Sequence, residues 1–116
     1  MSIEKGAEAE REAEAFLKAK GFKILERNFR LRMGEIDLIA RDADVVVFVE
    51  VRARSSNAFG TPQETVTMAK RRRIIRTAQA YVQRHALDAP MRFDVVARSP
   101  EGMLHIPDAF DTTGVL

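Results

Sequence analysis

Two carboxylates and an arginine lie in the most β-prone part of the chain, GEIDLIARDADVVVFVEVRAR at residues 34–54. Asp37 precedes Glu50 by thirteen positions, and Arg52 follows Glu50 two positions later. Most of the remaining residues are apolar, so the stretch predicts a buried β-hairpin that carries charges where valine would be more stable. Carboxylate oxygens are the ligands that a hard cation such as Mg²⁺ prefers.

The geometry of such a hairpin predicts that the two acids are neighbours. If residues 43–44 form a two-residue turn, Asp37 lies directly opposite Glu50, and in the same register Glu35 lies opposite Arg52. Directly opposed side chains have Cβ atoms about 4.5–5.5 Å apart. Two carboxylates at that distance repel each other unless a cation or nearby arginines compensate their charge. The stretch is therefore consistent with a metal site and also with a structural network of acids and arginines.

The elements expected around this hairpin follow the order αβββαββ. Apolar alternation predicts the strands, and helical periodicity with Ala-, Glu- and Lys-rich composition predicts the helices. The expected helices cover residues 3–20 and 65–87, and the expected strands cover residues 22–30, 34–41, 45–54, 91–98 and 103–110. This order predicts an α/β fold with helices packed on a mixed sheet. The length of 116 residues predicts a single domain, residues 1–116.

Each predicted helix has an apolar face that is expected to pack on the sheet. In the first helix Glu10 and Glu12 lie at the two edges of that face, and periodicity does not choose between them. In the second helix Lys70 and Arg71 lie beside the inward face of the first turns, where they could reach over the acids and contact phosphates. The polar residues expected to point away from the sheet are Arg72, Arg73, Arg76, Gln83 and Arg84.

Composition narrows the function classes further. The absence of cysteine removes disulfides, cysteine-based zinc fingers and thiol catalysis, and His85 and His105 are too far apart in the sequence to suggest a zinc motif. The longest strongly apolar run, residues 45–49, is too short to span a bilayer. The charged, amphipathic start of the chain has no signal-peptide core. We therefore expect a cytoplasmic protein that does not enter a membrane.

Several segments, taken in order, resemble the YraN-like family of bacteria (uncharacterised protein family 0102), which is related to archaeal Holliday-junction resolvases. The matching segments are FLKAKGFKILERNFR, GEIDLIAR, VFVEVRAR, VTMAKR, RFDVVA and DAF. The spacing of Asp37, Glu50 and position 52 also resembles the D-x(n)-(D/E)-x-K signature of restriction-endonuclease-like nucleases, in which the last position is normally lysine. The resemblance implies their three-layer fold, a central mixed sheet flanked by helices.

The resemblance also implies a metal site. Asp37 and Glu50 would hold Mg²⁺ or Mn²⁺, with the carbonyl of Val51 as an additional ligand. A glutamate on the first helix often completes such sites, and the match of FLKAKG places it at Glu10. Arg52 departs from the signature, because arginine stays protonated and cannot act as a general base, although it can clamp a phosphoryl oxygen. A counter-ion role for Arg52, beside Glu35 or Glu50, is the alternative.

Two hypotheses about function follow. In the first, the chain is a metal-dependent endonuclease that hydrolyses DNA, including branched or junction DNA, with Asp37, Glu50 and Arg52 as catalytic residues and Lys70, Arg71 and Arg54 contacting the nucleic acid. In the second, the chain is a non-catalytic nucleic-acid-binding protein that retains the nuclease fold.

Three further expectations concern the rest of the chain. Junction resolvases act as two-fold dimers, so the first hypothesis allows a homodimer, although the sequence shows no obvious dimer seam. Phe59 or Phe110 could form its seam or could pack internally. Asp94 is expected to serve as a structural partner of an arginine, and His105 is assigned no role.

Overall fold

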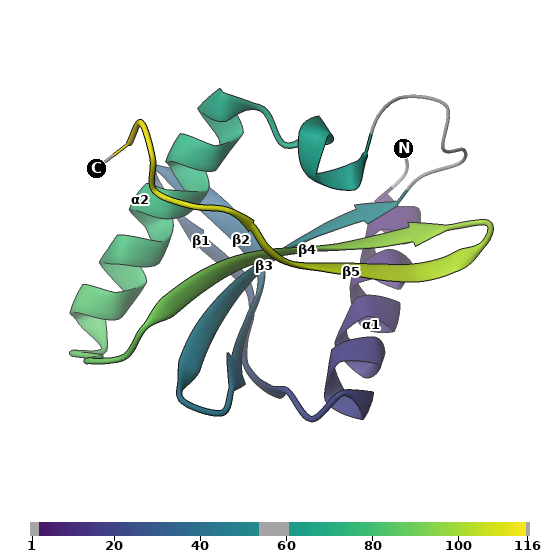
Figure 1. Cartoon of the computed structure of the whole chain (residues 1–116), viewed down its shortest axis with the longest axis horizontal. Helices are drawn as coiled ribbons and strands as arrows, with labels where there is room; N and C mark the ends of the chain where they lie inside the picture. Colours follow the sequence, from purple (N-terminus) through teal and green to yellow (C-terminus); the bar gives the residue numbers. More distant parts are fainter. Residues whose placement is uncertain (1–2, 54–60, 116) are drawn as a thin grey trace.

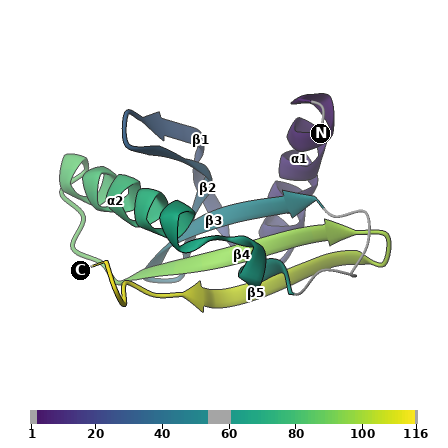
Figure 2. The same cartoon turned by 90° about the horizontal axis from the view of Figure 1, so that it is seen from above.

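A mixed sheet with one helix on each face forms the molecule (Figure 1, Figure 2). The computed structural model describes residues 3–53 and 61–115, with the side chains of the first helix from residue 6 onwards. The helices are α1 (Ile3–Ala19), α2 (Met68–Arg84) and a short 3₁₀ helix, η1 (Pro62–Thr65). The strands are β1 (Lys23–Leu31), β2 (Gly34–Asp42), β3 (Val45–Ala53), β4 (Met91–Ser99) and β5 (Gly102–Phe110). None of the helices in this described part is long and apolar enough to cross a membrane.

The strands follow one another across the sheet in chain order, β1-β2-β3-β4-β5. Neighbours are antiparallel except β3 and β4, which run parallel. Parallel neighbours need a long crossover connection, and here that connection includes η1 and α2. The predicted α/β class and the predicted order αβββαββ are both confirmed.

Both faces of the central strand β3 are buried, which explains its nearly unbroken apolar run. On one face, α1 packs on the sheet through a cluster that includes Ala13, Leu17, Leu38, Val47, Val49 and Val96. On the other face, α2 packs through a cluster that includes Ile39, Val46, Phe48, Ile75, Phe93 and Val95. Figure 2 shows the two helices separated by the sheet. Phe110 belongs to the second cluster and stacks on Phe93 with ring centroids 5.2 Å apart, so internal packing accounts for it; Phe59 lies outside the described residues.

Helix α2 is shorter than the sequence predicts, and its two ends have identifiable causes. Thr67 caps the start by accepting a hydrogen bond from the Lys70 amide at 3.2 Å. At the other end Ala86 has a φ of 49°, and the amide of Leu87 donates to the carbonyl of Val82 at 3.0 Å. This left-handed residue after the last turn is a Schellman ending, which stops the helix at Arg84.

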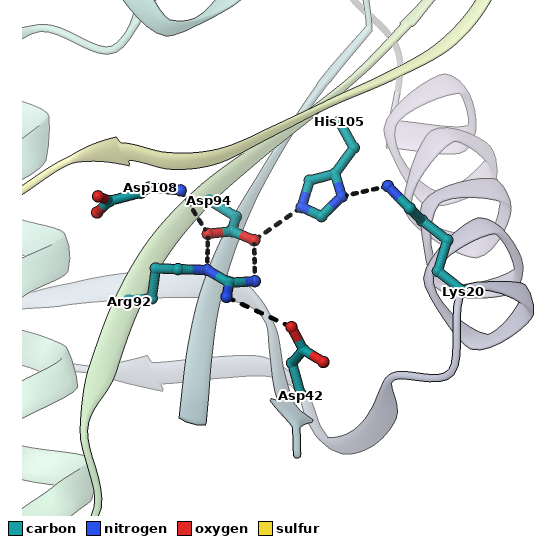
Figure 3. A network of polar contacts seen from close by, with 6 residues as sticks. All are labelled: Lys20, Asp42, Arg92, Asp94, His105 and Asp108. Carbon is teal, nitrogen blue, oxygen red and sulfur yellow. Dashed lines mark hydrogen bonds and ion pairs between the residues drawn. The ribbon is translucent and has the colours of Figure 1, made fainter. Parts of the chain in front are cut away.

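A polar network around Asp94 fastens the end of α1 to β4 and β5 (Figure 3). The Asp94 carboxylate accepts two hydrogen bonds from Arg92, at 2.8 and 3.0 Å, and one from the Asp108 amide at 2.9 Å. His105 Nε2 lies 2.7 Å from Asp94, and His105 Nδ1 lies 2.8 Å from Lys20 Nζ. Because an ammonium group has no lone pair, Nδ1 must accept and Nε2 must donate to Asp94. The expected arginine partner of Asp94 is present, and His105, assigned no role from sequence, belongs to the same network.

An ion pair between α1 and β1 predicts an acid-dependent loss of stability. Arg27 Nη2 donates to Glu14 Oε2 at 2.7 Å, and Lys18 Nζ lies 2.9 Å from the same oxygen. Hydrogen bonds from Arg27 and then from Lys18 lower the pKa of Glu14 from its usual 4.5 to about 2. A lowered pKa in the folded state contributes stability above pH 4.5, and this contribution is lost as the pH falls towards 2.

We therefore expect the free energy of unfolding of Glu14→Gln, measured by urea denaturation, to fall less than that of the wild type over this pH window. Glu12→Gln is the matched control, because Glu12 is more exposed and meets Arg98 at 3.4 Å. Identical pH profiles for the wild type and Glu14→Gln would contradict the assignment.

Candidate metal centre

The two acids of the hairpin lie where the β2–β3 ladder ends. Leu38 pairs with Val49, and the pairing continues in the predicted register to the turn. Beyond Leu38 and Val49 the strands are joined differently: the Val51 amide donates to Asp37 Oδ2 at 2.8 Å. The Asp37 carboxylate thus occupies the place of a ladder acceptor and reaches across to β3, beside Glu50.

Strand β1 is distorted beside the same point. Arg27 pairs with Leu38 and Phe29 pairs with Ile36, and Asn28 between them has a φ of 49°. Asparagine is among the few residues that adopt this left-handed conformation readily. Its side chain hydrogen-bonds to Glu10 of α1. Sequence analysis missed Asn28, although an asparagine inside an apolar-alternating strand is the signal that could have drawn attention to it.

The space between α1, β2, β3 and the start of α2 forms a pocket of about 160 Å³, which we call the Glu10 pocket. Its lining includes most of the residues predicted to form the site: Glu10, Asp37, Glu50, Val51, Arg52 and Lys70. Arg54, predicted to contact nucleic acid, lies outside the described residues. Side chains from α1 and α2, which lie on opposite faces of the sheet, therefore meet beside β2 and β3.

The carboxylates of this pocket are poorly solvated. Burial, followed by the negative charge of Glu50, raises the pKa of Asp37 to about 8. The hydrogen bond from the Val51 amide partly offsets this rise. Burial and the charge of Glu35 also raise the pKa of Glu10, whereas the hydrogen bond from Asn28 lowers it. Glu50 is 4% exposed. Each of these shifts reflects negative charge that is crowded where burial limits its hydration, and a bound cation would relieve it.

Two cationic side chains flank Glu50. Lys70 Nζ lies 2.6 Å from Glu50 Oε2, whereas the nearest nitrogen of Arg52 lies 3.6 Å from the same oxygen. Arg52 also donates to the carbonyl of Thr65 at 3.2 Å, and its buried Nε has no hydrogen-bond partner among the described residues. The close ion pair of Glu50 is therefore made by the lysine of α2, and the arginine at the signature position makes a longer one.

The positions of Arg71 and Arg73, which follow Lys70, differ in part from those expected from the sequence. Arg71 donates to the carbonyls of Val66 at 2.9 Å and Gln63 at 3.0 Å, and its guanidinium lies over the Phe110 ring. These contacts anchor the segment before α2. Arg73 is exposed, as helical periodicity predicts, and it also lines a second pocket together with Asp37 and Glu50. Periodicity alone could not show this pocket, because it depends on the contact between α2 and the start of β2.

The hairpin register does not bring Glu35 to Arg52. Glu35 is paired with Arg30 of the neighbouring strand β1, and their side chains form an ion pair at 3.2 Å. Arg52 contacts Glu50 and the carbonyl of Thr65 instead. The counter-ion alternative for Arg52 therefore concerns Glu50.

The donor set fits a hard divalent cation better than zinc. Within residues 3–53 and 61–115 no histidine, cysteine or carboxylate group of three or more is gathered closely enough to hold a metal by itself. Mg²⁺ is commonly held by one or two carboxylates and keeps waters or substrate phosphates as its other ligands. Asp37 and Glu50 provide such a pair, and Glu10 lines the same pocket.

Comparison with known proteins identifies the family. The family model described as uncharacterised protein family UPF0102 matches residues 9–97. The chain belongs to the UPF0102 family. A UPF0102 protein of Hahella chejuensis is 50% identical over 113 residues, which cover 94% of this chain and 91% of that protein. A UPF0102 protein of Persephonella marina is 44% identical over 108 residues, covering 92% and 93% of the two chains.

These relatives confirm the family resemblance seen in the sequence. The region matched by the UPF0102 model includes Glu10, Asp37, Glu50, Arg52 and Lys70, and therefore spans the whole candidate centre. It ends within β4, so that β5 and the Asp108 and His105 contacts to Asp94 lie beyond it.

Proposed function

We propose that this protein is a metal-dependent endonuclease that hydrolyses phosphodiester bonds in DNA, including branched or junction DNA. The observation that carries the proposal is the meeting of two carboxylates from adjacent strands, the buried Glu50 and the partly buried Asp37, with the ammonium group of Lys70. Two acids crowded in this way are costly for stability. Binding of a divalent cation and a phosphate would offset the repulsion between the two acids and would explain why both are present.

The residues that would hold the ion are Asp37 and Glu50, joined by the Val51 carbonyl and by Glu10 from α1. Bound there, Mg²⁺ or Mn²⁺ would lower the pKa of a coordinated water and polarise a phosphoryl oxygen. Asn28 holds Glu10 at the edge of the pocket through its hydrogen bond. The Val51 amide orients the Asp37 carboxylate through its 2.8 Å hydrogen bond.

Lys70 and Arg52 have separate parts in this proposal. An arginine cannot act as a general base, so the part of Arg52 is to supply positive charge and hydrogen-bond donors to a phosphoryl oxygen. Lys70 supplies the ammonium group that the nuclease signature places two residues after the second acid. It comes from α2 rather than β3, yet its Nζ reaches Glu50 at 2.6 Å.

The proposal is tested by incubating the protein with single-stranded, duplex and four-way-junction DNA in Mg²⁺, in Mn²⁺ and in EDTA. Cleavage that requires the cation is the expected result. DNA binding that survives EDTA, without cleavage of any substrate in either metal, would reject the nuclease and leave the non-catalytic nucleic-acid-binding protein.

Replacing Lys70 by methionine should lower the rate of DNA cleavage by about a hundredfold, the scale on which one electrostatic stabiliser of a transition state acts. Lys70→Arg keeps the charge and should retain more activity than Lys70→Met. Lys23→Met, which removes an exposed lysine at the start of β1, is the matched control and should cleave normally.

Lys70→Met also removes the closest counter-ion of a buried glutamate, so its stability must be measured by urea denaturation alongside its activity. A variant that is less stable but cleaves at the wild-type rate would show that Lys70 is a structural counter-ion.

A further inference from the structure

A second pocket adjoins the candidate centre on the side of α2. It has a volume of about 210 Å³, is lined by Glu35, Asp37, Glu50, Lys70, Arg73 and Ile74, and is called the Arg73 pocket below. The Glu10 pocket and the Arg73 pocket share Asp37, Glu50 and Lys70. The reacting groups of the proposed centre therefore lie between two adjoining spaces, and a linear substrate bound at the centre would extend into one or both of them.

Arg73 is the basic residue of the Arg73 pocket whose charge is not used within the described structure. It is exposed and, within residues 3–53 and 61–115, makes no ion pair or side-chain hydrogen bond. Lys70, by contrast, is paired with Glu50, and Arg71 is bonded to backbone carbonyls. Glu35 in the same pocket is paired with Arg30, so it does not compete for Arg73.

The position of Arg73 relative to the acids is fixed by a close contact between α2 and the β1–β2 turn. A Cβ atom added at Gly34 would lie 2.8 Å from Thr77 Oγ1 and 3.1 Å from both the Cβ and the carbonyl oxygen of Arg73. The buried Thr77 hydroxyl donates to the Arg73 carbonyl at 2.7 Å. Gly34 begins the strand that carries Asp37, so this contact sets the spacing between Arg73 and the carboxylates.

Lys70 and Arg73 lie three residues apart on α2 and therefore on adjacent turns of one helix face. Long cationic side chains in this arrangement suit neighbouring phosphates of one nucleic-acid strand, which are held by charge without reading the bases. An isolated phosphodiester would need the centre alone. A polynucleotide would also place a flanking phosphate in the Arg73 pocket.

We infer that Arg73 binds the phosphate next to the one at the acidic centre, and that the substrate class is therefore a polynucleotide strand rather than a small phosphodiester. This inference rests on the proposed function for the place of the reacting phosphate. The binding of the flanking phosphate, however, can be measured without any reaction.

The test compares Arg73→Ala with Arg72→Ala, which removes an exposed arginine that lines neither pocket. Binding of a fluorescein-labelled single-stranded DNA oligonucleotide is followed by fluorescence anisotropy in EDTA over a range of salt concentrations. We expect Arg73→Ala to weaken binding several-fold and to reduce the slope of log Kd against log salt concentration by about one. Arg72→Ala should stay close to the wild type.

Equal effects of the two substitutions, or no loss of affinity in Arg73→Ala, would overturn the inference. The outcome is independent of cleavage: a protein that cleaves nothing but loses affinity in Arg73→Ala alone would refute the nuclease and keep the phosphate site. Substituting a neutral methylphosphonate at single linkages supplies a second measurement. Neutralising the linkage held by Arg73 should weaken wild-type binding and leave Arg73→Ala binding unchanged, and equal weakening of both proteins at every linkage would also overturn the inference.

Discussion

Replacing Asp37 by asparagine is expected to reduce metal-dependent DNA cleavage by more than about a hundredfold, because loss of a direct metal ligand should exceed the effect of losing a residue that merely orients one. Asparagine keeps the shape of the side chain and an oxygen that can accept from the Val51 amide. The substitution thus removes the charge that a cation needs while disturbing the β2–β3 junction little.

The same substitution should make the metal-free protein more stable at neutral pH. Burial and the charge of Glu50 raise the pKa of Asp37 from 3.8 to about 8 in the folded chain. A carboxyl group with a raised pKa loses stability as the pH rises from 3.8 to 8, because the unfolded chain releases the proton first. Asparagine does not titrate, so we expect Asp37→Asn to exceed the wild type by at least about 1 kcal/mol in EDTA at pH 8.

Thermal unfolding in EDTA and in Mn²⁺ checks both parts of this prediction. Mn²⁺ should raise the Tm of the wild type, because a ligand that binds the folded state stabilises it, and should have little effect on Asp37→Asn. Asp44→Asn, in the exposed β2–β3 turn, is the control and should respond to Mn²⁺ like the wild type. Equal Mn²⁺ responses in the wild type and Asp37→Asn would exclude Asp37 as a ligand.

Replacing Asp94 should have the largest effect on stability. Asp94 is fully buried, and although burial alone would raise its pKa, the hydrogen bonds from Arg92, the Asp108 amide and His105 lower it. Removing one partner of a buried, hydrogen-bonded charge pair typically costs about 3–5 kcal/mol, because the other charge is left uncompensated. Asp94→Ala leaves Arg92 with only its longer contact to Asp42, and leaves the Asp108 amide and His105 without their acceptor (Figure 3).

The free energy of unfolding from urea denaturation measures this effect, with Asp42→Ala as the matched control. Asp42 also meets Arg92, but at 3.4 Å and with a side chain that is 42% exposed. An exposed ion pair contributes about 0–1 kcal/mol, so Asp42→Ala should cost little. A loss in Asp94→Ala no greater than in Asp42→Ala would show that the network contributes little to folding.

The local elements were largely predictable because their causes lie close together in the sequence. The register of β2 and β3 follows from a two-residue turn and from the side-chain period of a strand, and it was confirmed from Leu38 to the turn. A threonine cap before α2 was also predictable, at Thr65 or at Thr67, and the structure has it at Thr67. The ends of α2 were placed less well, since η1 takes up the residues before Thr67 and Ala86 adopts a left-handed conformation that alanine seldom does.

The sequence by itself determined the two acids, their spacing, the strands that carry them and the family to which the chain belongs. Tertiary structure alone decided where the basic residues of α2 lie. Lys70 pairs with Glu50, Arg71 donates to backbone carbonyls, and Arg73 lines the adjoining pocket. Tertiary structure also decided that His105 hydrogen-bonds to Asp94. The physical reason is that these contacts depend on how closely a helix packs on a strand that is distant in the sequence. For α2 the contact between Gly34 and Thr77 sets this distance, and helical periodicity carries no information about it.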